Sequence, residues 1–425
     1  MSARRRVVAV ILDGLRRDFV TPELMPVLTA LRQRGSWFDA HRSVFPSCTR
    51  VVSSSFATGF LPARHGLAGN TICLLDQGRL TLHDVGKPEF VDNKRRLTGH
   101  VLAKPTLAQR LADGGGVIVF NNVSPGAAYM HDPDGYGFVY HRAGSFGPGR
   151  VPIEGEGALD VTGDVAGDRK ATERFAAEVV LERRPDFALL WTAEPDTSQH
   201  ALALGSPAHH RILAEADRHV GLVLQSVEQA RAAGEDVLFL VGSDHGHETV
   251  SEVVDIGAEL VAAGLKADAD SDDVMVAPNG TGALVYVGLE HGERIPRIDR
   301  FLRAQTWAGR VFAADELESG AGLPSGGGLA FAVAMASDEG LNAHGVPGRS
   351  LAAKPVAGKG DRIGFGQHGG LGRFEQSPVL IVEGTGFEAG RKVGAASSAV
   401  DIAPTVLRFL GRQADGFDGR PLQDV

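Results

Sequence analysis

Val7-Val8-Ala9-Val10-Ile11-Leu12-Asp13-Gly14 is the stretch that decides the fold of this chain. A continuous apolar run rich in β-branched residues is typical of a strand that is buried on both faces of a parallel sheet. Arg4-Arg5-Arg6 resembles the start of a secretory leader, but the apolar run is short, ends at Asp13 and lacks a small-residue cleavage site. We therefore expect a cytoplasmic protein whose first element is a buried parallel strand.

Similar apolar runs recur along the chain and alternate with segments of helical periodicity. This alternation predicts an α/β fold with a mostly parallel central sheet and helices on both faces. The expected strands are Val7–Leu12, Val117–Phe120, Phe187–Trp191, Val237–Val241, Ala283–Val287 and Val379–Val382. The expected helices are Met25–Arg34, Arg50–Ala57, Thr106–Ala112, Lys170–Arg184, Pro207–Ala233, Ile256–Ala263 and Ile402–Leu410, with Thr106 and Asp401 at N-cap positions.

The composition is that of a globular protein with a surplus of acidic residues. The 425 residues are 43% hydrophobic and 22% charged, and the net charge is -9. This balance disfavours binding to a nucleic-acid polymer or an anionic membrane, and no apolar run is long enough to span a bilayer. Small anionic substrates remain open, because bound cations reverse the local charge of a site. Cys48 and Cys73 form no disulfide framework and are expected to be reduced.

Two stretches, 71–105 and 121–165, interrupt the alternation of strands and helices. Both are rich in Gly, Pro and Asp, lack a helical period and are too long for simple connections. We expect them to form a small cap over the active site. A third Gly-rich region, 318–328 and 339–370, lies between the last elements of the sheet. The whole chain, 1–425, is expected to be one catalytic domain with this cap.

Acidic and histidine residues directly follow three of the expected strands. Such side chains converge in an open sheet, because the carboxyl ends of parallel strands line one crevice. Carboxylates and imidazoles packed together require cations, and mixed O and N ligands suit Zn²⁺, with Mn²⁺ or Fe as alternatives. Each residue alone could be a turn or capping residue, whereas their joint occurrence indicates a metal centre. The residues are Asp13, after Val7–Leu12; Asp196 and His200, after Phe187–Trp191; and Asp244 and His245, after Val237–Val241.

Thr49 is the candidate nucleophile. It lies in Pro46-Ser47-Cys48-Thr49-Arg50, at the expected start of a helix, where free N–H groups and the helix dipole attract phosphate. A hydroxyl that contacts a metal at such a place can lose its proton and attack phosphorus. The alternative from local sequence is that Thr49 only caps the helix. Cys48 is a rival nucleophile, although no Cys–His arrangement is evident nearby.

Short motifs in a defined order carry a family resemblance. They are Asp13-Gly14; Thr49 ahead of Thr58-Gly59; Pro62-Ala63-Arg64-His65-Gly66; Glu194-Pro195-Asp196-Thr197-Ser198-Gln199-His200; Ser243-Asp244-His245-Gly246; Gln367-His368-Gly369-Gly370; Asp401-Ile402-Ala403-Pro404-Thr405; and Asp418-Gly419-Arg420-Pro421-Leu422. With this set the chain resembles the alkaline phosphatase superfamily, and within it the nucleotide pyrophosphatase/phosphodiesterase branch. The resemblance covers nearly the whole chain, and the ordered set is far more specific than any single motif.

The resemblance implies a centre of two divalent metal ions. It assigns Asp196, His200 and His368 to one ion, and Asp13, Thr49, Asp244 and His245 to the other. His344 competes with His368, but His368 precedes Asp401 at a spacing similar to that of the family. His65 is expected in a structural turn, and His209, His210 and His247 are expected at the surface or behind the ligands.

The resemblance further implies hydrolysis of phosphate esters through a phospho-threonine intermediate on Thr49. In the eukaryotic phosphodiesterase branch, an asparagine three positions after the nucleophile donates a hydrogen bond to the phosphate. This chain has Val52 at that position, which cannot donate. We therefore expect the phosphate oxygens to be bound by Arg50, Asn121 or Asn122.

Hydrolysis of phosphodiester or nucleotide pyrophosphate bonds is the function that these features favour, with a small phosphate ester or nucleotide-like molecule as substrate. The alternative is a phosphomonoesterase, which Arg50 would suit, or a phosphonate (C–P) hydrolase of the same superfamily. Phosphonoacetate hydrolases carry lysines where this chain has Asn121-Asn122-Val123-Ser124-Pro125, and sulfatases need a pattern that Cys48-Thr49-Arg50 lacks. A phosphoglycerate-mutase-like enzyme would need a larger insertion. A metal-stabilised binding protein without turnover is the alternative from another class.

Overall fold

β1 (Arg5–Leu12) is a buried parallel strand, as the apolar run predicted, and it lies in the interior of the main sheet. In the computed structural model, which describes residues 3–425, β1 pairs in parallel with β10 (Phe187–Thr192) and with β11 (Asp236–Gly242). β6 (Val117–Asn121) and β7 (Phe138–Tyr140) continue the parallel sheet beyond β10. The expected α/β fold with a mostly parallel central sheet is confirmed.

The outer strands of the main sheet are mostly antiparallel to their neighbours. On one side the order is β11, β20 (Leu380–Glu383), β2 (Ser36–Phe38) and β21 (Lys392–Val393), and on the other side β8 (Ser145–Gly147) and β9 (Val151–Ile153) follow β7. Residues 121–165, which we expected to cover the active site, therefore extend one edge of the main sheet. Their strands are only three residues long and carry no readable periodicity in the sequence.

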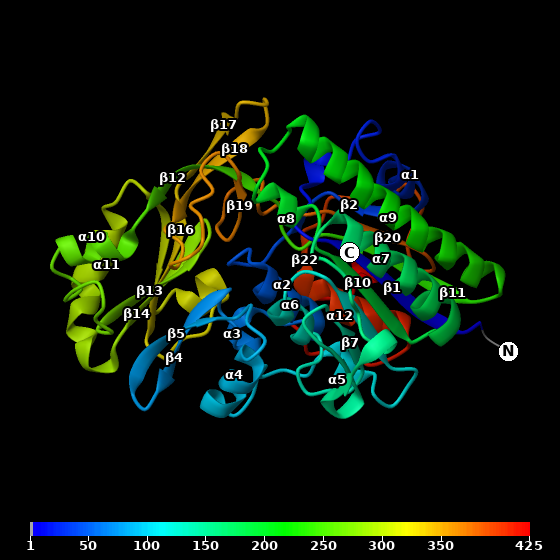
Figure 1. Ribbon diagram of the computed structural model, residues 1–425, viewed down its shortest axis with the longest axis horizontal. Helices are drawn as coiled ribbons and strands as arrows, with labels where there is room; N and C mark the ends of the chain where they lie inside the picture. The colour runs from blue at the N-terminus through cyan, green and yellow to red at the C-terminus, as the bar shows by residue number, and fades with distance from the viewer. Residues whose placement is uncertain (1–2) are drawn as a thin grey trace.

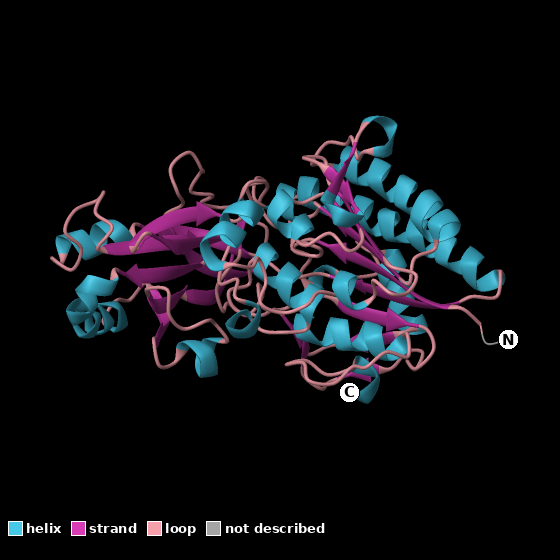
Figure 2. Cartoon of the chain, turned by 90° about the horizontal axis from the view of Figure 1, so that it is seen from below, coloured by secondary structure: helices cyan, strands magenta, loops and turns pink. Residues whose placement is uncertain are grey.

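Helices cover both faces of the main sheet (Figure 2). Val8, Val10 and Leu12 of β1 point into one core, and Val7, Ala9 and Ile11 point into the other. Burial on both faces explains why β1 reads as an unbroken apolar run. The first face is covered by α1 (Pro26–Arg34), α7 (Val165–Arg174), a π-helical continuation (Phe175–Arg183) and α9 (Pro207–Ala232); the second is covered by α2 (Thr49–Thr58), α5 (Leu107–Arg110) and α12 (Ile402–Phe409).

The two expected helix caps have different outcomes. The Thr106 side chain accepts the N–H of Gln109 and caps α5, as predicted. Asp401 does not cap α12 with its side chain. Instead, Asp401 accepts the N–H of Ser398 at 2.7 Å, and Ser398 caps the preceding helical turn. Asp401 is thus the second residue of a capping box whose first residue is Ser398. Ser398 lies upstream of the segment with helical periodicity, so the sequence pattern did not include it.

The smaller lobe, to the left in Figure 1, is the main departure from the expected fold. Ala283–Val287 was expected in the parallel sheet, which was wrong: it belongs to β14 (Gly282–Val287) of a separate antiparallel sheet. This sheet has the order β13 (Val274–Asn279), β14, β16 (Leu329–Met335) and β15 (Ala308–Ala313). A second small sheet has the order β17 (Ser337–Leu341), β18 (Pro347–Ala353), β12 (Glu248–Val254) and β19 (Gly366–Gln367).

Burial on both faces of β14 explains the error. Leu284 and Tyr286 pack into the core shared with the main lobe, whereas Val285 and Val287 pack on α10 (Ile256–Ala262) and α11 (Ile295–Arg303). A strand with two buried faces has no polar alternation, so its sequence resembles that of a parallel strand.

Residues 71–105 lie between the two lobes. They form a hairpin of β4 (Thr71–Asp76) and β5 (Arg79–Asp84), followed by α4 (Phe90–Thr98). Ile72, Cys73 and Leu80 of the hairpin pack in the same core as Leu284 of the small lobe. The remaining short elements are β3 (His41–Arg42), α3 (Pro62–His65), α6 (Pro125–Tyr129), α8 (Asp196–Gln199) and β22 (Ser397–Ser398). Among residues 3–425, no helix combines the length and apolarity that crossing a membrane requires.

Candidate active site

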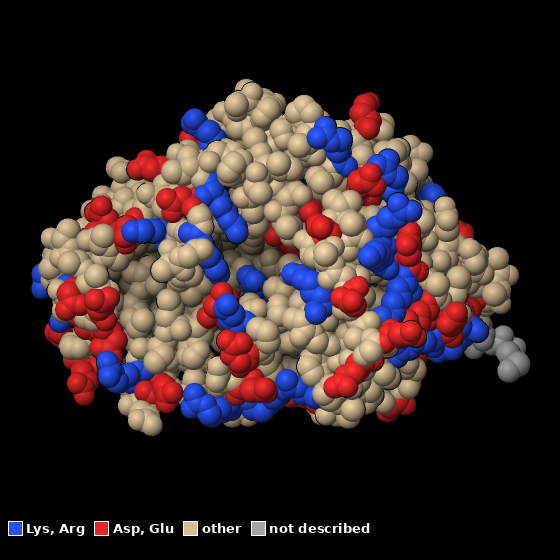
Figure 3. Space-filling model, viewed as in Figure 1, with Lys and Arg blue, Asp and Glu red and all other residues tan. Residues whose placement is uncertain are grey.

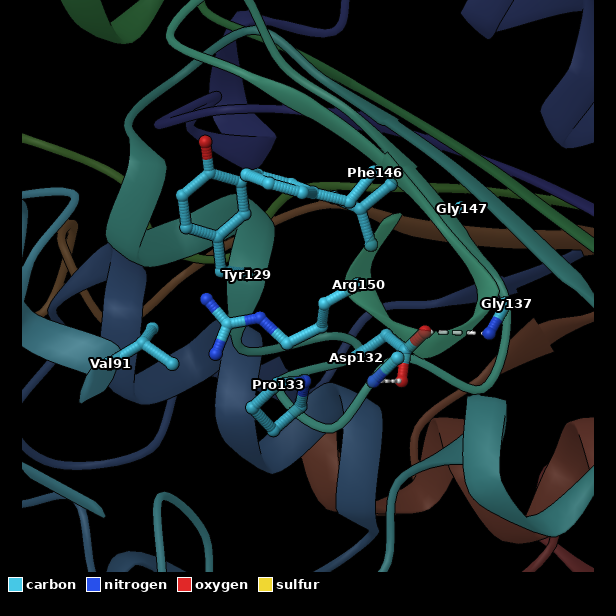
Figure 4. A pocket seen from close by; sticks show the side chains of 10 residues that line it. Val91, Tyr129, Asp132, Pro133, Gly137, Phe146, Gly147 and Arg150 are labelled. Atoms are coloured by element: carbon cyan, nitrogen blue, oxygen red, sulfur yellow. Dashed lines mark hydrogen bonds between the residues drawn. The ribbon is translucent and has the colours of Figure 1, made fainter. Parts of the chain in front are cut away.

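A cleft of about 380 Å³ lies between the two lobes, above the carboxyl ends of β1, β10 and β11. Figure 3 shows the hollow, with Lys and Arg side chains on both of its rims. The main lobe contributes Thr49, Arg50, Asn70, Asp196 and His200 to its lining, and the small-lobe side contributes His368 and several residues between Ala352 and Arg362. A second pocket, near α6 (Figure 4), is lined by Tyr129, Phe146 and Arg150, and Asp132 in it accepts the N–H of Gly137. Its volume of about 10 Å³ holds about one water molecule, so the cleft is the candidate active site.

Thr49 is the first residue of α2, and its hydroxyl does not cap the helix. Cys48 occupies the N-cap position and makes no side-chain capping hydrogen bond. Thr49 Oγ1 lies 3.2 Å from Nε2 of His245, a residue from the end of β11. The capping alternative for Thr49 is therefore excluded by the geometry, and the hydroxyl faces the cluster of acidic and histidine residues.

Cys48 is unsuited to be the nucleophile. Its side chain is buried, and burial raises the pKa of the thiol to about 12. The thiol is therefore protonated at neutral pH, whereas the thiolate is the reactive form.

Asp13 and Asp244 converge beside His245, as expected for residues at the ends of neighbouring strands. One oxygen of each carboxylate accepts a hydrogen bond. Trp191 Nε1–H donates to Asp13 Oδ2 at 2.9 Å, and the N–H of Gly14 donates to Asp244 Oδ1 at 3.0 Å. The other two oxygens, Asp13 Oδ1 and Asp244 Oδ2, are buried without a hydrogen-bond partner and lie 3.6 Å and 3.1 Å from His245 Nε2.

This arrangement fits a cation. Burial raises the pKa of Asp13 well above its ordinary value, and the nearby charges of Asp244 and Asp196 raise it further. Unpaired carboxylate oxygens in the interior are costly unless a cation or a hydrogen-bond donor compensates them. The three ligand atoms of Asp13, Asp244 and His245 lie within 4.8 Å of one another, which suits one metal ion.

A second group of ligand-type residues surrounds Asp196. Its Oδ1 lies 3.4 Å from Nε2 of His200 and 3.5 Å from Nε2 of His368. Burial alone would raise the pKa of Asp196, but His200, His247 and His368 lower it well below the ordinary range. His368, and not the exposed His344, is therefore the histidine that meets Asp196.

Backbone carbonyls orient the three histidines. The Nδ1 atoms of His200, His245 and His368 lie within hydrogen-bonding distance of the carbonyl oxygens of Gly366, Gly246 and Ser47, respectively. With Nδ1–H donated to a carbonyl, each ring keeps the Nε2 lone pair for a metal. Burial lowers the pKa of His200 to about 3, so its ring is neutral and able to bind a cation.

His247 belongs to the same cluster and lies behind the expected ligands, which was one of its two expected places. The residue is fully buried, and its Nε2 lies 2.8 Å from Asp196 Oδ1. Ligand atoms of Asp196, His245, His247 and His368 all lie within 4.8 Å of one another. The spacing His245-Gly246-His247 was the available signal, but nothing in the sequence indicated that the chain returns toward Asp196 before β12.

Asn70 is a residue that the sequence analysis missed. Its Oδ1 accepts the backbone N–H of Arg50 at 3.1 Å, and the residue lines the cleft next to Thr49. The amide group of Asn70 is therefore oriented beside Thr49 in the cleft. Asn70 follows the His65-Gly66 turn by four residues, which was the available signal.

Val52 and the two expected asparagines lie elsewhere. Val52 is buried in a hydrophobic cluster behind α2, so its position could not serve the phosphate. Asn121 Oδ1 accepts the N–H of Val123, and Asn122 Nδ2 donates to Asp168 Oδ1 at 2.9 Å. Neither Asn121 nor Asn122 lines the cleft, which corrects the expectation that they bind phosphate.

The remaining histidines have structural environments. His65 Nε2 lies 3.0 Å from Ser55 Oγ, and its Nδ1 accepts the N–H of Leu67, so it forms part of the turn after α3. His209 is buried rather than on the surface, and its Nε2 lies 3.1 Å from Gln199 Oε1.

Comparison with known proteins agrees with this geometry. The sequence matches the type I phosphodiesterase / nucleotide pyrophosphatase family over residues 7–306. It is 26% identical over 247 residues to venom phosphodiesterase 2 of Crotalus adamanteus, covering 56% of this chain and 26% of that protein. It is 25% identical over 248 residues to venom phosphodiesterase of Macrovipera lebetinus, covering 56% and 25%. The chain thus spans about a quarter of the length of these curated relatives.

Solved structures share the fold across the chain. Murine ectonucleotide pyrophosphatase / phosphodiesterase 5 superposes with a TM-score of 0.71 at 17% identity, over 99% of both chains. An inactive threonine-to-alanine variant of that murine protein, in complex with AMP, superposes with a TM-score of 0.70 at 17% identity, also over 99% of both chains. The family match covers most of the chain and includes Thr49 and most of the converging ligand-type residues. This chain therefore belongs to the type I phosphodiesterase / nucleotide pyrophosphatase family.

Proposed function

We propose that the protein is a metal-dependent hydrolase of phosphodiester or nucleotide pyrophosphate bonds that acts through transient phosphorylation of Thr49. The observation that carries this proposal is the position of the Thr49 hydroxyl, at the N-terminus of α2 and 3.2 Å from His245 Nε2. The free carboxylate oxygens of Asp13 and Asp244 lie around the same nitrogen. Family membership and the phosphodiesterase relatives support the same reaction class.

Two divalent ions are part of the proposal. Asp13, Thr49, Asp244 and His245 would hold one, and Asp196, His200 and His368 would hold the other, with His247 in contact with Asp196. The mixture of carboxylate oxygens and imidazole nitrogens favours Zn²⁺, with Mn²⁺ or Fe as alternatives. When bound, such ions would neutralise the buried carboxylates and lower the pKa of a hydroxyl that contacts them.

The residues of the chain account for the rest of the reaction. The Asn70 amide and the first turn of α2 would orient the phosphoryl oxygens toward Thr49. Thr49 Oγ1 would lose its proton to solvent and attack phosphorus, the bond from phosphorus to the leaving oxygen would break, and the leaving group would take a proton from solvent. A water molecule would then attack the phospho-threonine, release the phosphate product and restore the Thr49 hydroxyl.

The reaction class can be tested with two chromogenic esters. We expect metal-loaded protein to hydrolyse bis-p-nitrophenyl phosphate faster than p-nitrophenyl phosphate, and a chelator to abolish both activities until Zn²⁺ or Mn²⁺ is restored. Faster turnover of the monoester would support the phosphomonoesterase alternative. Absence of turnover with every metal would contradict enzymatic function and support a metal-stabilised binding protein.

A further inference from the structure

A strap of residues 354–365 borders the cleft on the small-lobe side, between β18 and β19. Two ion pairs hold it in place. Lys354 Nζ lies 2.8 Å from Asp255 Oδ2 within the small lobe, and Lys359 Nζ lies 3.0 Å from Asp84 Oδ2 at the end of β5. The strap is therefore tied to the hairpin between the lobes, and its inward-facing residues have a defined position over the cleft.

Two neighbouring charged residues of the strap, Asp361 and Arg362, line the cleft. Among residues 3–425, Arg362 makes no side-chain hydrogen bond or ion pair with the protein. Its backbone has a φ of 58°, in the left-handed region that is uncommon for a residue with a side chain. Arg362 thus combines a strained backbone conformation with free guanidinium donors beside the cleft. Such donors can bind an anion from outside the protein.

Arg50 approaches the same cleft from the main lobe. Its Nε–H donates to Ser124 Oγ at 3.1 Å, and its terminal nitrogens have no hydrogen-bond partner among the described residues. Arg50 and Arg362 therefore line the same cleft from its two sides, and an anion in the cleft can meet both guanidinium groups.

The lining of the cleft offers no aromatic side chain on which a nucleobase could stack. Within residues 3–425, no Phe, Tyr or Trp side chain lines it. Proteins that bind bases commonly stack them on aromatic rings. The charged groups of the lining beyond the metal-ligand cluster are Arg50, Lys359, Asp361 and Arg362, of which Lys359 is paired with Asp84.

We propose that Arg50 and Arg362 together bind a second anionic group of the substrate. The preferred substrate is then a small phosphoryl compound that carries a further phosphate, phosphonate or carboxylate near the reacting phosphorus and needs no stacked base. This proposal rests on the proposed function for the position of the reacting phosphoryl group. Bidentate contacts from two guanidinium groups would distinguish such a molecule from a simple monoanionic diester.

The test measures binding, so that it does not depend on turnover. Isothermal titration calorimetry on metal-loaded protein would compare methylphosphonate, which has one anionic group, with phosphonoacetate and methylenediphosphonate, which add a carboxylate or a phosphonate. We expect at least one of the two larger ligands to bind roughly tenfold or more tightly than methylphosphonate. The one that gains more identifies the second anion as carboxylate or phosphonate.

Two variants assign that gain to the strap. Arg362→Gln is expected to remove the tenfold advantage while the affinity for methylphosphonate stays unchanged, and Arg362→Lys should restore part of it. Arg349→Gln is the matched control, because Arg349 is an exposed arginine of β18 that pairs with Asp338 at 2.9 Å, away from the cleft lining. Equal affinities in the wild type, an advantage that survives in Arg362→Gln, or an equal loss for all three ligands would overturn the proposal. If only diester hydrolysis failed, the proposed function would be contradicted, but the comparison of ligand affinities could still be interpreted.

Discussion

The Nδ1 atom of His368 lies 2.6 Å from the carbonyl oxygen of Ser47, two residues before Thr49. The N–H of Gly369 donates to Ser47 Oγ at 2.9 Å, and Ser47 Oγ lies 3.1 Å from the buried carboxylate of Glu375. The loop that carries His368 is thus attached directly to the turn that carries Thr49. Thr49, the proposed nucleophile, and His368, a proposed metal ligand, are thus positioned as a unit, although they are far apart in the sequence.

Replacement of Thr49 by alanine is expected to lower kcat for bis-p-nitrophenyl phosphate by roughly a thousandfold or more, because the attacking oxygen is lost. Thr49→Ser, which keeps a hydroxyl, is the matched control and should retain measurable turnover. Acid-quenched wild-type protein should carry a phosphoryl adduct on Thr49 in mass spectra. An adduct on another residue, or near wild-type rates in Thr49→Ala, would disprove the role of Thr49.

Substitution of Asn70 should affect catalysis, whereas substitution of Asn122 should affect stability. Asn70→Ala removes an amide beside Thr49 and is expected to lower kcat by about a hundredfold, with metal content unchanged. Asn122→Ala removes one of the buried donors to Asp168, which keeps the N–H groups of Ala193 and Glu194, and should lower the free energy of unfolding by about 1–3 kcal/mol, with little effect on kcat of the folded protein. Steady-state kinetics and urea denaturation measure the two effects. The reverse pattern would show that Asn122, and not Asn70, serves the phosphate.

Metal removal is expected to destabilise the protein. Chelation would leave Asp13 Oδ1 and Asp244 Oδ2 buried without a partner, so the melting temperature should fall by roughly 5 °C or more and recover when Zn²⁺ is added. The melting temperature of Asp13→Asn should fall less on chelation, because one of the two mutually repelling carboxylates is absent. Asp338→Asn, at an exposed ion pair of the small lobe, should respond like the wild type. A melting temperature that ignores the chelator would argue against resident metals.

Lys94 should give stability a distinct dependence on pH. The residue is 2% exposed in α4, and burial lowers its pKa from 10.5 to about 8. Because the folded-state pKa lies below the unfolded value, the unfolded chain binds more protons between these two pH values, and stability rises with pH across that window. Lys94→Met is expected to increase the free energy of unfolding at pH 7 by up to about 3 kcal/mol, and this gain should shrink toward pH 10.5.

Chemical denaturation at pH 7, 9 and 10 measures the Lys94 effect, with buffers chosen to stay within the native range. Lys170→Met is the control, because Lys170 is an exposed lysine of α7. If the two variants showed the same pH dependence, the burial of Lys94 would not be the source of the effect.

Much of the site could be predicted because its residues follow strands directly. Asp13, Asp196 and Asp244 occur at the ends of apolar runs that are legible in the sequence, and parallel strands present these ends along one edge. Asn70, His247 and Arg362 could not be predicted in the same way. Each is placed by contacts with remote segments: Asn70 with Arg50, His247 with Asp196, and Arg362 by a strap whose Lys359 reaches Asp84.

The sequence by itself determined the class of fold and indicated that Asp13, Asp196 and Asp244 converge, because apolar periodicity and strand-end positions are local properties of the chain. Only the tertiary structure decided that the strand at Ala283–Val287 belongs to a separate antiparallel sheet, and that the cleft lies between that lobe and the main sheet. The physical reason is that strand pairing and the meeting of remote loops depend on which surfaces bury one another. A strand that is buried on both faces has the same continuous apolar pattern in a parallel sheet as in an antiparallel one.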